Sequence, residues 1–231
     1  MFVADRRLAL GYRALAAVVI GWGVGRVTGL FDGRFAGAEL LYFTVLSNIL
    51  CLAWFALLAV VTGRELRVRG GRGPSAPWPR VSGAVMMAIT VTMLIYLVVL
   101  VPETFVQNSS YTPFTLTDDL IHIVTPVLTI LDWVLFVPKG SFRWFDPLLW
   151  ALIPYAYLVF AFAYGALGGR FGAGTSYPYP FMDVQALGVG GVALWIVVLT
   201  VALEVVAYLY VVVDRALGAL ARRRSGRARV S

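Results

Sequence analysis

The chain has 231 residues, of which 60% are hydrophobic and 13% charged, with a formal net charge of +7 and a mean hydropathy of +0.83. A water-soluble domain of this size could not bury so much apolar surface, so the composition excludes an ordinary soluble fold and indicates an integral membrane protein. The positive charge does not indicate nucleic-acid binding, because the basic residues lie beside apolar runs, where anionic lipid headgroups account for them.

Six apolar runs reach the roughly 20 residues that an α-helix needs to cross a bilayer. In chain order they cover about residues 8–30, 40–62, 82–101, 119–137, 145–167 and 188–213. Helices are expected because no alternation of period two appears, and because open strands would leave backbone polar groups unpaired in lipid. We therefore predict an all-α polytopic membrane protein with six transmembrane helices in one bundle.

Basic residues gather at alternate connections and predict the direction of the helices. They are Arg6 and Arg7 before the first run, five arginines within 64–80, Lys139 and Arg143 between the fourth and fifth runs, and six arginines within 214–231. Under the positive-inside rule this pattern places both termini in the cytoplasm. It makes 64–80, which is also rich in Gly and Pro, a flexible cytoplasmic loop and 214–231 a basic cytoplasmic tail. The Arg-rich, Lys-poor composition favours a bacterial plasma membrane.

Three of the runs carry polar or small side chains three, four or seven residues apart, so that each set shares one helix face. These stripes are Thr44, Ser47, Asn48 and Cys51 in the second run, Asp118, His122, Thr125, Thr129 and Asp132 in the fourth, and Thr200, Glu204 and Tyr208 in the sixth. Polar side chains inside a membrane usually face other helices or a wet cavity, so we expect the three stripes to point inward.

His122 is the only histidine, and it lies in the fourth run. Thr44 and His122 both lie about 5–6 Å below the outer end of their runs, so they can share one layer. A neutral imidazole is the usual base for activating a hydroxyl, and together the two residues could form a nucleophile–base pair for acyl transfer from an ester. Asn48, one turn below Thr44, could donate to an oxyanion or hold a water. Pro126 leaves the His122 carbonyl without its usual helical partner, which favours a local distortion.

Structural roles for the same residues remain open. A threonine in a membrane helix commonly bonds the carbonyl one turn back, and Ser47 and Asn48 could hold helices together. Nearer the cytoplasm, Arg13 is expected to form a structural ion pair with Asp132 or Glu204. One histidine and one cysteine are too few to predict a metal site, and no cofactor is expected.

Three motifs resemble the family of the androgen-induced and androgen-dependent TFPI-regulating proteins, which has bacterial relatives. The motifs are Tyr42-Phe43-Thr44-Val45-Leu46, then His122 with Pro126 and Asp132, then Tyr179-Pro180-Phe181-Met182-Asp183 with Gly188. They follow the order of that family and cover the chain from the second run to the sixth. The animal members have two threonines after the histidine, whereas Ile123 and Val124 follow here.

The resemblance implies a multi-pass hydrolase of fatty acid esters of hydroxy fatty acids, with Thr44 as the nucleophile and His122 as its base. We add Ser47, Asn48, Asp119, Thr125 and Asp183 as supporting or pocket residues. The expected partners are membrane lipids and a lipid-ester substrate; the sequence does not define an oligomeric state. Two alternatives come from other classes: a non-enzymatic lipid-binding or transport bundle, and a small helper subunit of a larger assembly.

Overall fold

The computed structural model describes residues 1–102 and 112–227, so the last four residues of the predicted tail lie outside the described residues. The long helical segments are α1 (Arg6–Val27), α2 (Phe43–Arg69), α3 (Pro79–Ile95) with η3 (Tyr96–Leu100), α5 (Leu116–Asp119) with η4 (Leu120–Val124) and α6 (Thr125–Phe136), α7 (Asp146–Trp150) with α8 (Leu152–Ala166), and α9 (Val184–Arg227). Short turns add η1 (Leu30–Asp32), η2 (Gly37–Leu41), η5 (Gly172–Gly174) and η6 (Pro180–Met182). Six segments are long and apolar enough to cross a membrane, and no strand occurs in the described part of the chain. The predicted all-α, six-helix class is confirmed.

Two helices extend well beyond their apolar runs. The second run was expected to end near residue 62, but α2 continues to Arg69 and stops at Gly70, whose φ of 77° suits glycine. The sixth run was expected to end near residue 213, but α9 continues to Arg227. The added residues are rich in Arg, Leu and Ala, which are good helix formers in water as well as in lipid. Hydropathy therefore marked the apolar part of each helix and missed its polar continuation.

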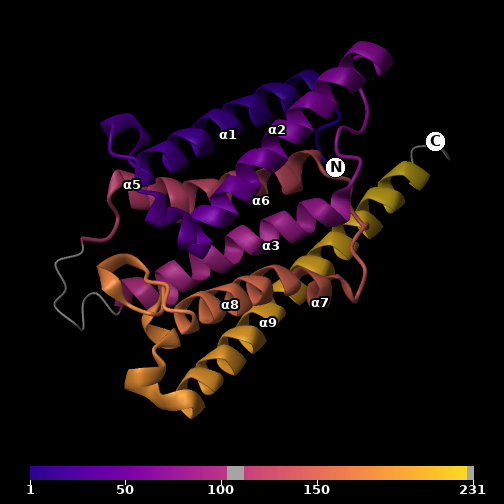
Figure 1. The fold of residues 1–231 in the computed structure, drawn as a ribbon. Coiled ribbons are helices and arrows are strands. Elements are labelled where there is room, and N and C mark those ends of the chain that lie inside the picture. Colours follow the sequence, from indigo (N-terminus) through magenta and orange to yellow (C-terminus); the bar gives the residue numbers. More distant parts are fainter. Residues whose placement is uncertain (103–111, 228–231) are drawn as a thin grey trace.

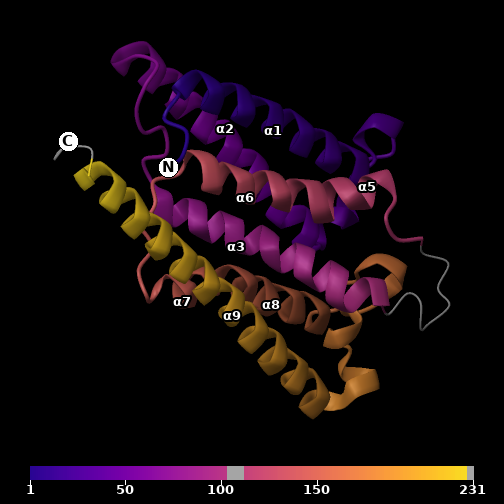
Figure 2. The same cartoon turned by 180° about the vertical axis from the view of Figure 1, so that it is seen from behind.

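Helix α3 lies between two groups of helices, with α1, α2 and α6 on one side and α8 and α9 on the other (Figures 1 and 2). Its side chains are correspondingly buried on both faces. Ile89 belongs to a cluster with Ile20 and Phe55, toward α1 and α2, and Met87 belongs to a cluster with Trp150 and Ala207, toward α7 and α9. The central position of α3 sets the spacing between the two groups.

Helix α1 begins and α9 ends at the same end of the bundle (Figures 1 and 2). At this end Arg6 ties down the connection after α2, although 64–80 was expected to be a flexible loop. The Arg6 guanidinium donates to the carbonyls of Gly70, at 2.8 Å, and of Pro74, at 3.1 Å. The Arg6 amide donates to Gly71, at 2.7 Å. Because Arg6 is 4% exposed, these bonds are shielded from water and hold the connection against the start of α1.

Candidate functional site

Thr44 lies in the first turn of α2, at the opposite end of that helix from the Arg6 contacts. Tyr42 is extended, with φ −93° and ψ 139°, and its carbonyl accepts from the amides of Val45 and Leu46. The Tyr42 side chain makes no capping hydrogen bond to the helix. The local chain therefore places the Thr44 hydroxyl beside the positive end of a 27-residue helix, where negative charge is stabilised.

His122 lies in η4, a π-helical turn that interrupts the fourth apolar helix. The Thr125 amide donates to the Leu120 carbonyl five residues back, and the Thr125 hydroxyl donates to the same carbonyl at 2.9 Å. Pro126 has no amide hydrogen to continue an ordinary α-helical turn, so a wider turn satisfies the backbone at this point. Thr125 thus closes the turn that presents His122.

The structure brings Thr44 and His122 together. The Thr44 hydroxyl oxygen is 3.5 Å from the His122 Nε2 atom. On the other side of the ring, His122 Nδ1 is 3.1 Å from the Asp118 carbonyl oxygen. A carbonyl only accepts, so Nδ1 carries the hydrogen and the Nε2 lone pair faces Thr44. His122 is 7% exposed, which shields this arrangement from bulk water.

Asn48 holds the two halves of the site in register. Its side-chain amide donates to the Thr44 carbonyl at 2.7 Å and to the Ile121 carbonyl at 2.9 Å. Both hydrogens of the Asn48 amide are therefore used between helices, and the predicted donation to an oxyanion would require one of these bonds to break. Ser47 is also engaged: its hydroxyl lies 3.0 Å from the Thr44 carbonyl and 2.7 Å from the Thr92 hydroxyl.

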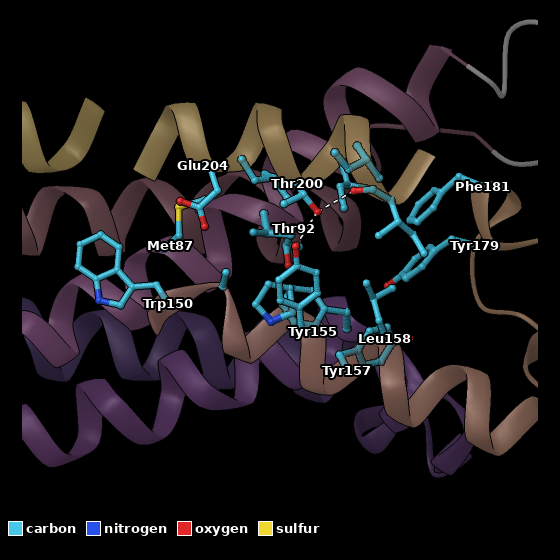
Figure 3. Close-up of a pocket in the computed structure, with 18 of the residues that line it drawn as sticks. Met87, Thr92, Trp150, Tyr155, Tyr157, Leu158, Tyr179, Phe181, Thr200 and Glu204 are labelled. Atoms are coloured by element: carbon cyan, nitrogen blue, oxygen red, sulfur yellow. Dashed lines mark hydrogen bonds between the residues drawn. The ribbon is translucent and has the colours of Figure 1, made fainter. Parts of the chain in front are cut away.

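Thr44 also lines a cavity, part of whose wall is drawn in Figure 3. Thr44, Tyr157 and Tyr179 line one end of it, and most of the remaining wall comes from apolar side chains of α3, α8 and α9. This lining resembles that of small-molecule sites, which are mostly apolar with a few polar groups. His122 is not part of the wall, so Thr44 stands between the imidazole and the cavity.

Tyr157 and Tyr179 are site residues that sequence reasoning missed. Tyr179 lies at the start of α2, where it interacts with Thr44 and packs against the rings of Tyr157 and Tyr42, with centroids 6.4 Å and 6.1 Å away. The Tyr157 hydroxyl donates to the Leu41 carbonyl at 3.0 Å. Burial raises the pKa of Tyr179, which keeps its phenol protonated and able to donate. The motif that begins at Tyr179 is visible in the sequence, but nothing in its spacing indicates that the chain folds back onto the start of α2.

Asp183 and Asp119 are two further predicted site residues. Asp183 caps α9, accepting from the amides of Gln185 at 2.8 Å and Ala186 at 3.0 Å. Its pKa is lowered by hydrogen bonds from Tyr177 and these amides. The Oδ1 atom of Asp119 is shielded and has no hydrogen-bond partner in the described part of the chain. No group of three possible metal ligands occurs among residues 1–102 and 112–227.

Arg13 pairs with Asp132, with the Arg13 Nε atom 2.8 Å from the carboxylate. The same guanidinium donates to the Thr62 hydroxyl at 2.7 Å and to the Ser75 carbonyl at 2.9 Å. Glu204, the third residue expected in this ion pair, instead lines the cavity. The separation of Glu204 from Arg13 has a simple cause, because α1 packs on the side of α3 opposite to α9 (Figures 1 and 2).

No protein-family model matches the chain, and no curated protein or solved structure is similar to it.

Proposed function

We propose that this protein is an intramembrane hydrolase of lipid esters, with Thr44 as nucleophile and His122 as general base. The observation that carries the proposal is the 3.5 Å contact between the Thr44 hydroxyl and the free Nε2 atom of His122, at the wall of an apolar cavity. A distance at the long end of hydrogen bonding is common before substrate binds, and such contacts tighten in the reacting complex.

In the first half of the reaction, His122 Nε2 takes the hydroxyl proton of Thr44 as the Thr44 oxygen attacks the ester carbonyl carbon. The carbonyl oxygen becomes an oxyanion, and we assign the phenol of Tyr179, which lies beside Thr44, as its donor. The ester C–O bond then breaks, and the leaving alkoxide receives the proton from His122. The products of this half are a free alcohol and an acyl ester of Thr44.

In the second half, His122 takes a proton from a water that attacks the acyl carbon. The bond to Thr44 breaks, Thr44 recovers its proton from His122, and a carboxylic acid leaves. The Asp118 carbonyl keeps the Nδ1 hydrogen in place throughout, as the third group of a hydrolase triad does for its base. No cofactor or metal enters this scheme.

The cavity supports a lipid-like substrate, because its wall is mainly apolar and it lies among helices that are apolar enough to cross a membrane. The family resemblance supports esters of fatty acids with hydroxy fatty acids as the natural class. Basic residues gather at the end of the bundle where α1 begins and α9 finishes, and they support a cytoplasmic position for that end of the bundle. Thr44 then lies near the outer face, and we propose the bacterial plasma membrane as the location.

The test compares purified variants in detergent on a fluorogenic long-chain ester. Thr44→Ala and His122→Ala are each expected to lower kcat by about a hundredfold or more, while Thr129→Ala keeps wild-type turnover. Thr129→Ala is a matched control, because it removes a buried hydroxyl two turns beyond His122 that bonds the Thr125 carbonyl and Cys51. Wild-type turnover by either site variant contradicts the mechanism and favours a lipid-binding or transport bundle.

Covalent labelling distinguishes the two neighbouring hydroxyls. A fluorophosphonate probe is expected to label the wild type and Ser47→Ala, but not Thr44→Ala. Ser47 is already bonded to Thr92 and to the Thr44 carbonyl, so its oxygen is not presented to His122. Labelling that persists in Thr44→Ala would assign the nucleophile to another residue.

A further inference from the structure

Glu204 is the only acidic side chain among the described residues of the cavity wall. Its Oε2 atom is shielded from solvent and has no hydrogen-bond partner within the described chain. The other polar groups in the middle of the cavity are paired. The Tyr155 hydroxyl lies 2.9 Å from the Thr200 hydroxyl, and Thr92 lies 2.7 Å from Ser47. Glu204 is therefore a polar group of the wall that is open to a ligand.

Glu204 lies toward the Trp150 end of the cavity, whereas Tyr157 and Tyr179 lie at the other end beside Thr44 (Figure 3). Trp150 and Tyr157 are seven residues apart along the α7–α8 segment, which corresponds to about 10 Å at the rise of a helix. An extended acyl chain covers that length with roughly eight carbon atoms, given ordinary C–C bond lengths and tetrahedral angles.

A carboxyl group among apolar helices is costly to bury unless it finds a hydrogen-bonding partner. In either protonation state it keeps an oxygen that accepts a hydrogen bond, and a plain hydrocarbon chain offers no donor. A neutral hydroxyl can enter an apolar cavity at a much smaller desolvation cost than an ammonium group. The chemistry of the wall therefore favours a chain that carries a hydroxyl.

We propose that Glu204 recognises a free hydroxyl on the acyl chain of the ligand, roughly eight carbons from the ester carbonyl. The cavity then selects esters whose acyl group is itself a hydroxy fatty acid with its hydroxyl far from the ester. Within the proposed class of esters it disfavours unsubstituted acyl chains and chains hydroxylated beside the carbonyl. The proposal rests on the proposed function in one respect, namely that the ester lies at Thr44.

The test measures binding to the full chain carrying Thr44→Ala, so that esters are not turned over. Three decanoyl methyl esters compete with a fluorescent fatty acid: one with a distal hydroxyl, one with the hydroxyl beside the carbonyl, and one with none. A hydrogen bond to the Glu204 carboxyl group is expected to make the distal-hydroxyl ester bind about tenfold more tightly than the other two.

Adding Glu204→Leu is expected to remove this preference, whereas adding Thr200→Val is expected to leave it. Thr200 is a matched control, because it lies one turn away on the same helix and lines the same cavity, and its hydroxyl is already bonded to the Ile196 carbonyl at 2.7 Å. Equal binding of the three esters, or a preference that survives Glu204→Leu, overturns the proposal. If Glu204→Leu does not fold, the affinities of the distal-hydroxyl and proximal-hydroxyl esters for the Thr44→Ala protein still test the proposal, because equal affinities overturn it.

The two proposals fail separately. Undiminished ester hydrolysis by Thr44→Ala overturns the hydrolase mechanism and leaves the hydroxyl preference intact. A cavity that binds the three esters equally while Thr44→Ala is inactive overturns only the role of Glu204.

Discussion

Tyr96 and His122 stack face to face, with ring centroids 4.0 Å apart and planes 8° from parallel, and each belongs to a π-helical turn. Tyr96 begins η3 at the end of α3, and His122 is the middle residue of η4. Such turns are rare and often lie at functional sites, because the wider turn changes the direction of the side chains near it. Two of them therefore meet at the imidazole that faces Thr44.

The stack is expected to hold His122 in the orientation that proton transfer needs. Tyr96→Leu removes the ring and should lower kcat about tenfold with little change in KM, as a stacked aromatic pair contributes up to about 1.5 kcal/mol. Tyr96→Phe keeps the ring and should stay close to the wild type, and steady-state kinetics on a fluorogenic ester measures both. Wild-type kcat in Tyr96→Leu would show that the Asp118 carbonyl suffices to orient the imidazole.

Tyr179 is expected to stabilise the oxyanion of the transition state. Tyr179→Phe should lower kcat by about a hundredfold, in the range seen when one oxyanion donor is removed, while KM changes little. Tyr155→Phe is the matched control, because Tyr155 lines the same cavity but bonds Thr200 instead of Thr44. Equal kcat in the two variants would remove Tyr179 from the chemistry.

Arg13 and Asp132 are expected to stabilise the protein only when both are present. Arg13 is fully buried and Asp132 is 3% exposed, so replacing either partner alone leaves an uncompensated buried charge. Arg13→Leu or Asp132→Leu should each lower the free energy of unfolding by about 3–5 kcal/mol, and the double variant should recover most of that loss. Thermal unfolding in detergent followed by circular dichroism measures the three variants. A double variant as unstable as the sum of the single ones would contradict this coupling.

Lys139 is expected to make stability depend on pH. Burial lowers the pKa of Lys139 to about 8, and its ammonium lies over the Trp133 ring and donates to the Trp133 carbonyl. Since the folded pKa is below that of an unfolded lysine, the folded protein binds fewer protons above about pH 8, and stability rises with pH from there to roughly pH 10.5. The wild type should therefore gain stability relative to Lys139→Met across this window. Parallel stability curves for the two proteins would contradict the pKa shift.

Much of the fold could be predicted because membrane helices follow from local properties of the chain. The length of each apolar run and the need to pair every backbone group in lipid are enough to predict six helices. Helical spacing likewise placed Thr44 with Ser47 and Asn48 on one face, and a depth estimate placed His122 in the same layer. Helix ends were predicted less well, since α2 and α9 continue with polar residues that hydropathy does not mark.

The cavity could not be predicted, because it forms between elements whose contact no local pattern records. Tyr179 reaches Thr44 only because the chain between α8 and α9 folds back over the start of α2, where Tyr42 also meets Tyr179 edge to face. From the sequence, Asn48 is predicted to be an available donor, and only the packing of the helices shows that its amide donates to two carbonyls. Glu204 likewise belongs by spacing to an inward stripe, but its neighbours depend on which helices pack beside α9.

The sequence by itself determined that six apolar helices form and which of their faces are polar, because both depend on the chemistry of residues within a few turns of one another. Tertiary structure decided which polar faces meet: it set the imidazole of His122 against the hydroxyl of Thr44, 78 positions away in the chain, and separated Glu204 from Arg13. The physical reason is that contacts between helices depend on how α3 packs between its two groups of neighbours, and hydrophobic burial in lipid is too unspecific to define that packing from composition.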